Sequence, residues 1–433
     1  MFLYSLVLVV ALGLSSPWWL WKMATTDKYR EGLAERLGRV PPRLELPGDD
    51  RPVIWMHAVS VGEVIAIGGL VRELRARAPG CRVIVSTTTR TGQEIARERF
   101  GAENVFYYPF DFGFAVQRYL RVLRPHLFVL AETEFWPRML WECRRAGIPV
   151  AVVNARISDH SLPRYLRLRS LWRRILGALT VVLAQSEEDM ARLRAIGVPA
   201  ERVKMGGNLK YDVRAAADAK AVAAIRGAMP EDARLLVCGS TLAGEEDLLV
   251  NAWPGLVAAE PKLRMVLAPR HPERFTSVAE LLDRSGMRWH RRSDWHAGPA
   301  AGSSIVFEAG SVLLLDSIGE LASIYSLAAV AFVGGSLVAA GGHNPLEPAQ
   351  FGVPIVMGPH YENFREIVEK LQSREAIRIT PAAGLSEVLA GLLRYEAASR
   401  ALGDRAQSVF NAEAGATAKA VDVLLALLPG DAA

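Results

Sequence analysis

The sequence predicts an α/β protein made of two doubly wound units, each with a parallel sheet covered by helices on both faces. The chain has 433 residues, enough for two or three domains with substantial cores. Short, continuously apolar runs alternate with stretches whose apolar residues recur at helical spacing. Strands that are apolar throughout are typical of a parallel sheet that is buried on both faces.

A membrane-anchoring helix is predicted ahead of the first unit, in residues 1–22. Residues 2–21 contain no charged side chain, and as a helix of roughly 30 Å they would match the hydrocarbon core of a bilayer. Three tryptophans end this run, and lysines and arginines follow it but do not precede it. The positive-inside rule then places the rest of the chain in the cytoplasm. The alternatives are a helix lodged in one leaflet and a cleaved signal peptide, although the basic segment that begins such peptides is missing.

The first unit, residues 23–210, is predicted from seven strand-like runs with helical stretches between most of them. These runs are 52–60, 81–89, 104–110, 126–134, 148–156, 179–186 and 202–208. A helix over 164–179 is rich in arginine and places Leu168, Leu171, Ile175 and Leu179 on one face. That helix either covers the core with a solvated basic face or meets a membrane surface.

The second unit, residues 211–433, begins with an alanine-rich helix over 215–228. Strand-like runs resume at 234–241, 264–270, 311–317, 328–336 and 353–359, and the chain closes with alanine-rich helical sequence. We expect a cleft between the two units, because such clefts are favoured ligand sites.

The charge and cysteine content of the chain indicate which classes of binding partner to expect. The formal net charge of +5 favours anionic partners such as substrate phosphates or an acidic membrane surface. No long basic run or basic stripe with aromatic residues points to nucleic acid. Cys81, Cys143 and Cys238 are widely spaced and lack a CxxC pattern, so neither a disulfide framework nor a zinc site is expected.

Several charged residues of the first unit stand where ligands bind in open α/β sheets. Glu63 lies between the first strand and the helix after it, at the carboxyl end of the strand, where ligand crevices form. A glutamate in the first turn of a helix also complements the helix dipole, and that interpretation remains open. Glu132 and Glu134 follow another buried strand and would face the same side if the segment is extended. Lys210, at the domain junction, is a candidate cation for them.

The second unit contains a glycine-rich segment, 334–342, that leads into a predicted helix start. Asn344 suits the N-cap, Pro345 the first helical position and Glu347 the third. Glycines allow close approach of a phosphate, and the helix N-terminus attracts its charge. Glu347 is then placed to accept hydrogen bonds from ribose hydroxyls. The alternative is that Asn344 and Glu347 form a capping box that serves only their own helix.

Two other strand ends of the second unit supply candidate ligand contacts. Pro269 and Arg270 follow one strand, and Gly319, Glu320 and Leu321 open a helix after another. A nucleoside monophosphate needs a cation for its phosphate and donors for its base, which these residues can supply. Each segment alone is also compatible with an ordinary surface turn.

Many of these segments together carry a family resemblance. The segments HAVSVGEVIA, AETEFWP, NARISDHS, AQSEED, GNLKYD, APRHPERF, GELASIY, AFVGGSLV, GGHNPLEPA and MGPHYENF follow in this order over nearly the whole chain. Together they closely resemble the membrane-associated Kdo transferases. These enzymes add 3-deoxy-D-manno-octulosonic acid (Kdo) to the lipid A precursor in lipopolysaccharide biosynthesis.

The resemblance implies a fold, a reaction and roles for single residues. It implies an inverting glycosyltransferase of the two-domain GT-B type that uses CMP-Kdo, requires no metal ion or other cofactor, and is located at the inner membrane with its catalytic domains on the cytoplasmic side. By the same resemblance Glu63 is the general base, and Glu132 and Lys210 assist the transition state. The implied CMP-binding set is Pro269, Arg270, Gly319, Glu320, Leu321, Asn344, Pro345, Leu346 and Glu347.

Two other functions fit the same sequence features. A GT-B transferase that uses a UDP-sugar would need a similar glycine-rich loop and glutamate but a different base pocket. A non-catalytic nucleotide-sugar-binding membrane protein would need the second unit but not Glu63. A comparison of CMP with UDP binding distinguishes the UDP-sugar transferase from a CMP-Kdo transferase. Substitution of Glu63 distinguishes the non-catalytic binder, which does not need this residue.

Overall fold

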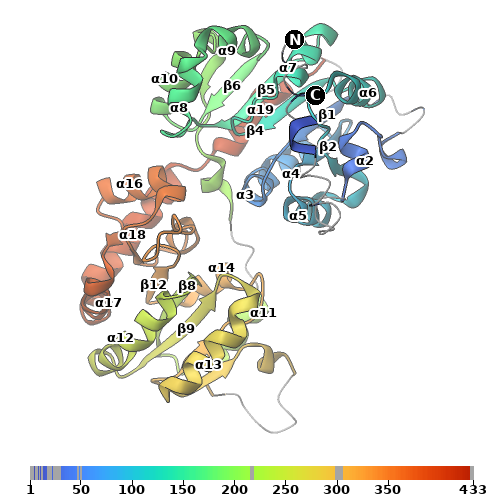
Figure 1. The fold of residues 1–433 in the computed structure, drawn as a ribbon. Helices are drawn as coiled ribbons and strands as arrows, with labels where there is room; N and C mark the ends of the chain where they lie inside the picture. Colours follow the sequence, from blue (N-terminus) through green and yellow to red (C-terminus); the bar gives the residue numbers. More distant parts are fainter. Residues whose placement is uncertain are drawn as a thin grey trace. The chain divides into compact units, whose positions relative to one another are not determined.

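The computed structural model of the chain describes residues 31–45, 51–214, 219–297 and 306–429, together with residues 4, 8, 10, 13–16, 22 and 48. The chain divides into two compact units (Figure 1). Unit 1 comprises Met1–Val213 and Glu413–Ala433, and unit 2 comprises Arg214–Ala412. Each unit is a doubly wound α/β structure with a 7-stranded parallel sheet, as the alternating pattern predicts.

The sheet of unit 1 has the strand order β3-β2-β1-β4-β5-β6-β7. Its strands are β1 Val53–His57, β2 Arg82–Thr87, β3 Val105–Tyr107, β4 Leu127–Ala131, β5 Val150–Ala155, β6 Val181–Ala184 and β7 Val203–Met205. The register pairs Trp55 with both Ile84 and Phe128, at the centre of the sheet. The chain winds outward from β1 in one direction and from β4 in the other, so the order reverses between these two strands.

Helices cover both faces of this sheet because its strands are apolar on both sides. The helices of unit 1 are α2 Leu33–Arg36, α3 Val61–Ala66, α4 Gly68–Arg77, α5 Arg90–Phe100, α6 Gly113–Leu123, α7 Pro137–Ala146, α8 Leu162–Arg167, α9 Arg169–Leu176, α10 Glu187–Ile196 and α19 Ala416–Leu425. Short 3₁₀ turns are η2 Pro42–Leu44, η3 Ala102–Asn104, η4 Ala200–Arg202 and η5 Leu209–Asp212. One core joins the sheet to α6, α7, α9 and α10, and the other joins it to α3, α4, α5 and α19.

The C-terminal helix α19 belongs to unit 1, although the sequence prediction assigned all of 211–433 to the second domain. Ala420, Val421 and Leu424 are buried in the core that contains α4. Asp212 accepts hydrogen bonds from the backbone N–H groups of Gly415 at 2.6 Å and Thr417 at 2.5 Å, at the start of α19. The predicted boundary was therefore wrong for residues 413–433, because the apolar face of α19 packs against unit 1 rather than unit 2 (red in Figure 1).

The sheet of unit 2 has the order β10-β11-β9-β8-β12-β13-β14. Its strands are β8 Arg234–Thr241, β9 Leu263–Pro269, β10 Trp289–Arg291, β11 Val312–Leu314, β12 Val330–Val333, β13 Ile355–Met357 and β14 Arg378–Ile379. The reversal of order falls between β8 and β12. The two edge strands, β10 and β14, were not predicted, because they are only 3 and 2 residues long and neither is fully buried.

The helices of unit 2 also form two layers. They are α11 Ala219–Gly227, α12 Glu245–Ala259, α13 Phe275–Ser285, α14 Leu321–Ile324, α15 Leu346–Ala349, α16 Arg365–Ser373, α17 Leu385–Arg394 and α18 Glu396–Ala412, with 3₁₀ turns η6 Pro272–Arg274, η7 Ser293–Ala297, η8 Tyr325–Leu327, η9 Glu362–Phe364 and η10 Ala382–Gly384. One core joins the sheet to α12, α13 and α17, and the other joins it to α11 and α14.

The helix predicted over 164–179 is two helices, α8 and α9, which meet at Leu168. Leu168 and Leu171, which we predicted on the core face, are 52% and 53% exposed. Ile175 and Leu179, the other two residues predicted on this face, do pack in the core, together with Tyr165, Trp172 and Leu176. The break at Leu168 separates α9 from α8, so a single helical periodicity does not describe the segment.

The predicted anchor, residues 1–22, lies almost wholly outside the described residues. Within the part of the chain that the structure describes, no helix has the length and apolar character needed to cross a membrane. The anchor and the placement at the inner membrane therefore stay predictions.

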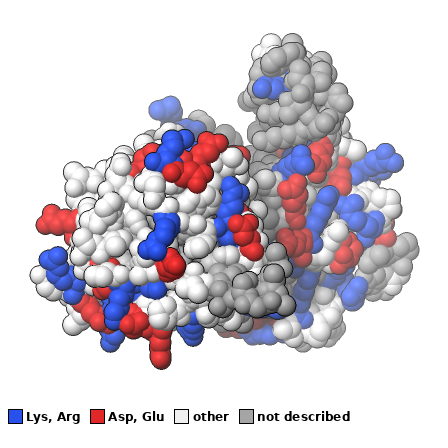
Figure 2. Space-filling model, turned by 90° about the horizontal axis from the view of Figure 1, so that it is seen from below, with Lys and Arg blue, Asp and Glu red and all other residues white. Residues whose placement is uncertain are grey.

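Two features of composition can be located in the described residues. Cys81, Cys143 and Cys238 are free and buried. Figure 2 shows acidic and basic side chains interspersed over the described residues of the face it presents.

Candidate active site

The reversal of strand order in unit 1 brings two predicted site residues to one edge of the sheet. Glu63 follows β1 and Glu132 follows β4, and these strands are direct neighbours. Ligands of open α/β sheets bind at the carboxyl ends of the strands where the order reverses. Lys210 follows β7, at the far side of the sheet, but its segment η5 contacts the Glu63 helix, α3. All three predicted residues of unit 1 therefore belong to segments at this edge.

Glu63 closes the start of α3 with both of its carboxylate oxygens. One oxygen accepts from the Val59 backbone N–H at 2.9 Å, and the other accepts from the Ser60 hydroxyl at 2.9 Å. Ser60 is the N-cap of α3, and its Oγ accepts from the Glu63 backbone N–H at 3.4 Å. The reciprocal capping interaction that was the structural alternative is therefore present.

Capping does not account for the electrostatic state of Glu63. The side chain is only 8% exposed, and burial raises the pKa of Glu63 to about 7. The charges of Glu132 and Glu134 act in the same direction, while the bonds from Val59 and Ser60 oppose the rise. A carboxyl group that titrates near neutral pH can accept a proton during a reaction, which is the property a general base needs.

Glu132 is held in an unusual backbone conformation directly after β4. Its φ is +68°, in the left-handed region that non-glycine residues seldom adopt. The segment 132–134 is therefore not extended, contrary to our expectation, and the alternation rule does not apply to it. Glu132 and Glu134 still interact, because burial and then the charge of Glu132 raise the pKa of Glu134. Three carboxyl groups thus influence one another at this edge.

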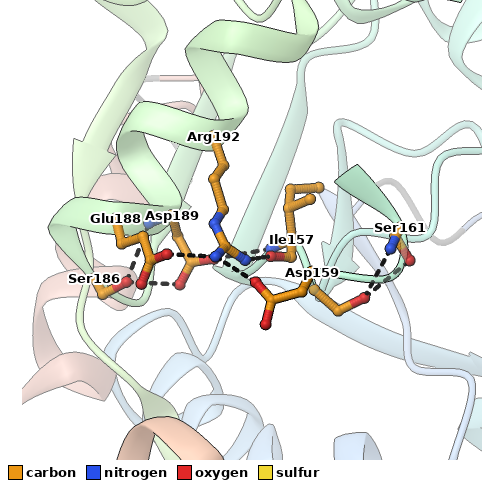
Figure 3. Close-up of polar contacts among 8 residues, drawn as sticks. Ile157, Asp159, Ser161, Ser186, Glu188, Asp189 and Arg192 are labelled. Atoms are coloured by element: carbon orange, nitrogen blue, oxygen red, sulfur yellow. Dashed lines mark hydrogen bonds and ion pairs between the residues drawn. The ribbon is translucent and has the colours of Figure 1, made fainter. Parts of the chain in front are cut away.

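The loop after β5 is fixed by α10 (Figure 3). Asp189 accepts from the Ile157 backbone N–H at 2.8 Å, and Arg192 donates to the Ile157 carbonyl at 2.6 Å and to Asp159 at 2.5 Å. Arg192 also pairs with Glu188, one turn before it on the same helix. This loop lies at the same edge as the glutamates. Sequence reasoning assigned no role to Asp189 or Arg192, because nothing local in the chain shows that they reach the loop after β5.

In unit 2 the glycine-rich segment follows β12 and lies beside the end of β8, at the second reversal of strand order. Glu245, at the start of α12 and fully buried, accepts hydrogen bonds from the N–H groups of Gly335, Ser336 and Leu337 at 2.7, 2.9 and 2.9 Å. A Cβ at Gly334 would lie 2.5 Å from the Ser240 carbonyl oxygen. Glycine is therefore required where this loop passes the end of β8, and a carboxylate that we did not predict holds the loop.

The predicted helix start at 344–347 is displaced in the structure. The helix α15 covers only Leu346–Ala349 and its N-cap is Pro345, so neither Asn344 as N-cap nor Pro345 as first residue was correct. Asn344 instead accepts from the Leu346 backbone N–H at 3.1 Å in a local turn. The proline at position 345 disfavours the helical conformation for Asn344. A helix this short has few aligned peptide dipoles, so its attraction for a phosphate is small.

Arg270 and Glu347 influence each other electrostatically, although they lie far apart in the sequence. Burial raises the pKa of Glu347, and the positive charge of Arg270 opposes that rise. Burial, together with the charges of Arg270 and His271, lowers the pKa of His343 to about 4. The backbone N–H of Arg270 donates to the Thr241 carbonyl at 2.9 Å, which ties the end of β9 to that of β8. Pro269 and Arg270 thus lie at the same edge of the sheet as 343–347.

The segment 319–321 is shaped by a buried ion pair. Glu320 accepts from Arg292 at 2.8 Å, and their side chains are 9% and 5% exposed. Gly319 has a φ of +94°, and Leu321 begins α14. The carboxylate of Glu320 is thus engaged within the protein, so it is the backbone of this turn rather than that side chain that remains a candidate for contact with a base.

No metal-binding cluster is found in the described ranges. Among those residues no group of three or more His, Cys, Asp or Glu side chains is arranged to hold a metal ion.

Comparisons with known proteins cover most of the chain. A family model described as 3-deoxy-D-manno-octulosonic-acid transferase (kdotransferase) matches residues 31–213. The 3-deoxy-D-manno-octulosonic acid transferase of Haemophilus influenzae is 33% identical over 404 residues, 92% of this chain and 92% of that protein. The enzyme of the same name from Bordetella pertussis is 34% identical and covers 94% of both chains.

Two solved structures are similar to this chain in fold. A UDP-GlcNAc 2-epimerase from Neisseria meningitidis has a TM-score of 0.58 at 13% identity, over 87% of this chain and 100% of its own. The glycotransferase of kitacinnamycin has a TM-score of 0.52 at 16% identity, over 88% of this chain and 100% of its own. At such low identity these similarities show the fold alone, which resembles that of GT-B glycosyltransferases.

Proposed function

The chain belongs to the family of 3-deoxy-D-manno-octulosonic acid transferases, and we propose that it transfers Kdo from CMP-Kdo to a lipid A precursor at a membrane surface. As a member of this family it is a glycosyltransferase of lipopolysaccharide synthesis. The donor, the acceptor and the roles of single residues are proposals. The observation that carries them is the buried Glu63 beside Glu132, at the reversal of strand order in unit 1, with a pKa raised to about 7.

In the proposed reaction Glu63 is the general base. The acceptor is a sugar hydroxyl, a weak nucleophile near neutral pH, and a carboxylate within about 3 Å can remove its proton as attack proceeds. The hydroxyl oxygen forms a bond to the anomeric carbon of Kdo, while the bond from that carbon to the CMP phosphate breaks. The electron pair of the broken bond leaves with CMP, and a single displacement of this kind inverts the anomeric configuration. Glu132 and Lys210 help to stabilise the charges that develop in the transition state.

In this proposal unit 2 binds the nucleotide. Arg270 offsets the negative charge that grows on the leaving phosphate, and the backbone of 334–347 surrounds it. Glu347 accepts hydrogen bonds from ribose hydroxyls, and the turn at Gly319–Leu321 meets the base. Because α15 is a single turn, the phosphate site depends more on Arg270 and on loop amides than on a helix dipole.

The test is direct transfer. The purified full-length protein is incubated with CMP-Kdo, generated in situ, and a tetraacylated lipid A precursor, and the products are weighed by mass spectrometry. We expect a mass gain of one or more Kdo units in the wild type and a loss of most of the gain in Glu63→Gln. CMP should bind more tightly than UDP. Preference for UDP would favour the UDP-sugar transferase, and CMP binding with no transfer would favour a non-catalytic binder.

The exposed surface of α8 and α9 supports the proposed membrane association. Leu166, Leu168 and Leu171 are exposed. The two helices contain no acidic residue, and all the arginines in and between them are exposed, namely Arg164, Arg167, Arg169, Arg173 and Arg174. Apolar side chains among cations suit the headgroup region of an anionic bilayer.

Vesicle flotation tests this surface. We expect Arg173→Glu with Arg174→Glu to reduce binding to vesicles that contain anionic lipid. The control pair, Arg72→Glu with Arg99→Glu, makes the same change of charge on α4 and α5, which cover the opposite face of the sheet. An equal loss of vesicle binding in both double variants would mean that net charge alone causes the effect. It would contradict α8–α9 as the surface that contacts the membrane.

A further inference from the structure

Three buried amide side chains run along the carboxyl edge of the sheet in unit 1. Asn154 lies near the end of β5, Gln185 directly follows β6, and Asn208 follows β7, on three adjacent strands. Their exposed fractions are 3%, 6% and 6%. A buried amide is costly unless its donors and acceptors are satisfied, so such a row requires a set of partners.

The three residues are linked by a chain of hydrogen bonds that includes the backbone carbonyl of Asn154. Asn208 Nδ2 donates to Gln185 Oε1 at 2.9 Å, and Gln185 Nε2 donates to the backbone carbonyl of Asn154 at 2.8 Å. Asn154 Nδ2 then donates to Glu132 Oε1 at 3.4 Å. The other end of the chain is the Lys210 backbone N–H, which donates to Asn208 Oδ1 at 3.0 Å. The chain thus connects Glu132 with the backbone of Lys210.

Backbone groups fix the orientation of every amide in this chain. Asn154 Oδ1 accepts from the Leu209 N–H at 3.1 Å, so the Asn154 NH₂ group must face Glu132. Asn208 Oδ1 accepts from the Lys210 N–H, so the Asn208 NH₂ group must face Gln185. Gln185 then presents its oxygen to Asn208 and its NH₂ to a carbonyl. The side-chain donors of all three residues are therefore directed along the row toward Glu132, and the row passes through the backbone of Asn154.

The backbone at the Glu132 end of this chain is strained. Glu132 and Asn154 both have positive φ, +68° and +56°, and neither is glycine. Such conformations cost free energy and persist where the surrounding structure enforces them, often at functional sites. Asparagine adopts this region more readily than glutamate does, so Glu132 carries most of the strain, at the end of the chain that meets the proposed site.

We propose that Asn154, Gln185 and Asn208 are positioning residues, which hold the carboxylate of Glu132 and the segment of Lys210 in fixed places for transfer. This inference rests on the roles proposed for Glu132 and Lys210. Glu132 receives a directed donor, and η5 is tied to β5 and β6 through side chains that make no contact with the reacting atoms. Misplacement of a reacting group by a small distance is enough to slow a reaction on the order of 10²-fold.

Two isosteric variants test the chain without removing the local turns. Asn208→Asp keeps the oxygen that accepts from Lys210 but loses the NH₂ group that donates to Gln185. Asn154→Asp keeps the bond from Leu209, tolerates positive φ, and places a second carboxylate against Glu132. We expect kcat for Kdo transfer from CMP-Kdo to fall on the order of 10–100-fold in both. The KM for CMP-Kdo and the affinity for CMP, which are assigned to unit 2, should stay within about twofold of wild type.

The matched control is Asn104→Asp. Asn104 also donates to a glutamate, Glu103, at 2.8 Å, but it precedes β3 and so lies at the amino edge of the sheet. The kcat of the Asn104→Asp variant should equal that of the wild-type protein. A wild-type kcat in Asn208→Asp, or a lower melting temperature without loss of kcat per folded molecule, would overturn the inference.

A third variant covers the case in which Asn154→Asp does not fold. Gln185→Glu keeps the oxygen that faces Asn208 and places the other oxygen against the Asn154 carbonyl, so it should lower kcat in the same way. Wild-type kcat in both Gln185→Glu and Asn208→Asp would reject the chain as a positioning device. Absence of transfer by the wild-type protein, in contrast, would reject the proposed function and the inference with it.

Discussion

Glu63 satisfies both interpretations that its position in the sequence allows. Its carboxylate caps α3, and burial, with other carboxyl groups nearby, raises its pKa to about 7. Capping alone favours the ionised form, because a carboxylate accepts N–H donors and complements the helix dipole. The net rise therefore means that desolvation outweighs the capping interactions. This balance is what a group needs if it must be ionised near neutral pH and still take up a proton.

The first prediction concerns the rate of transfer in Glu63→Gln. The amide keeps the shape of the side chain but cannot accept a proton, so the chemical step should fall on the order of 10²–10⁴-fold. Affinity for CMP should stay close to wild type, because the proposed nucleotide residues belong to unit 2. Single-turnover transfer and CMP binding are measured on the same preparation. Glu94→Gln, an exposed change on α5, is the control; near-normal transfer by Glu63→Gln would make Glu132 the next candidate base.

The second prediction concerns stability and pH. Because the pKa of Glu63 is higher in the folded protein, about 7, than its ordinary value of 4.5, the folded state holds the proton more tightly. The stabilisation is complete below pH 4.5 and is lost as the pH rises through 7, by roughly 3 kcal/mol in total. Thermal melts at pH 5 and pH 8 should therefore show a smaller loss of stability in Glu63→Gln than in wild type. Parallel losses in the two proteins would contradict the raised pKa.

Among the helices and loops, a few charged side chains organise whole segments. Asp189 and Arg192 on α10 fix the loop after β5, and Glu245 on α12 fixes the loop after β12. Both anchors belong to helices that follow a neighbouring strand, so each ties together two strand ends at the edge where the proposed site lies. Loops that must contact a ligand gain a defined shape in this way without a packed core of their own.

The third prediction concerns Glu245 and the glycine-rich loop. In Glu245→Gln the NH₂ group would face N–H donors, so at least one of the four bonds from Leu242, Gly335, Ser336 and Leu337 is lost. A hydrogen bond to a charged group contributes about 1.5–3 kcal/mol, so both CMP affinity and the melting temperature of unit 2 should fall. Isothermal titration with CMP and calorimetry measure the two effects. Glu280→Gln, an exposed change on α13, should alter neither, and unchanged CMP affinity in Glu245→Gln would separate this loop from nucleotide binding.

Over its full length, the chain crosses from unit 1 to unit 2 and returns. The return places α19 in the core of unit 1, capped by Asp212 just before the chain first leaves that unit. Unit 1 is therefore not a continuous segment, and its stability depends on residues from the end of the sequence.

The fourth prediction follows from this return. Removal of residues 413–433 takes Ala420, Val421 and Leu424 out of the core that α4 shares, and exposes the apolar side chains that they cover. Burial of one such leucine or valine contributes about 1.5–3 kcal/mol, so the truncated protein should unfold at a lower temperature, with the loss confined to unit 1. Hydrogen exchange locates the loss: weakened protection of α4 is expected, and unchanged protection of α4 would contradict the packing. Weakened protection in unit 2 alone would instead support the boundary that the sequence predicted, in which residues 413–433 belong to the second domain.

The two doubly wound units, and most of their strands, could be predicted from the sequence without further information. Continuous apolar runs report burial on both faces of a sheet, and the segments around Glu63 and Glu347 are local in the chain. The edge strands β10 and β14 were not predicted because they are short and half-exposed. The helix start near Asn344 was misplaced because Pro345 restricts the backbone before it, and the Asn344 side chain accepts from the Leu346 N–H in a turn of its own.

Folding, in contrast, decided which distant residues act together. The order of strands put the ends of β1 and β4 side by side, and burial there, reinforced by the charge of Glu132, raises the pKa of Glu63. The amide chain joins three strand ends, and Glu245 holds a loop that lies about 90 residues further along the chain. Helix α19 joined unit 1 because its apolar face had a core there to enter. Local sequence determines which element forms, since propensity and periodicity act over a few residues. Pairing between elements depends on packing and burial, which exist only once the chain has folded.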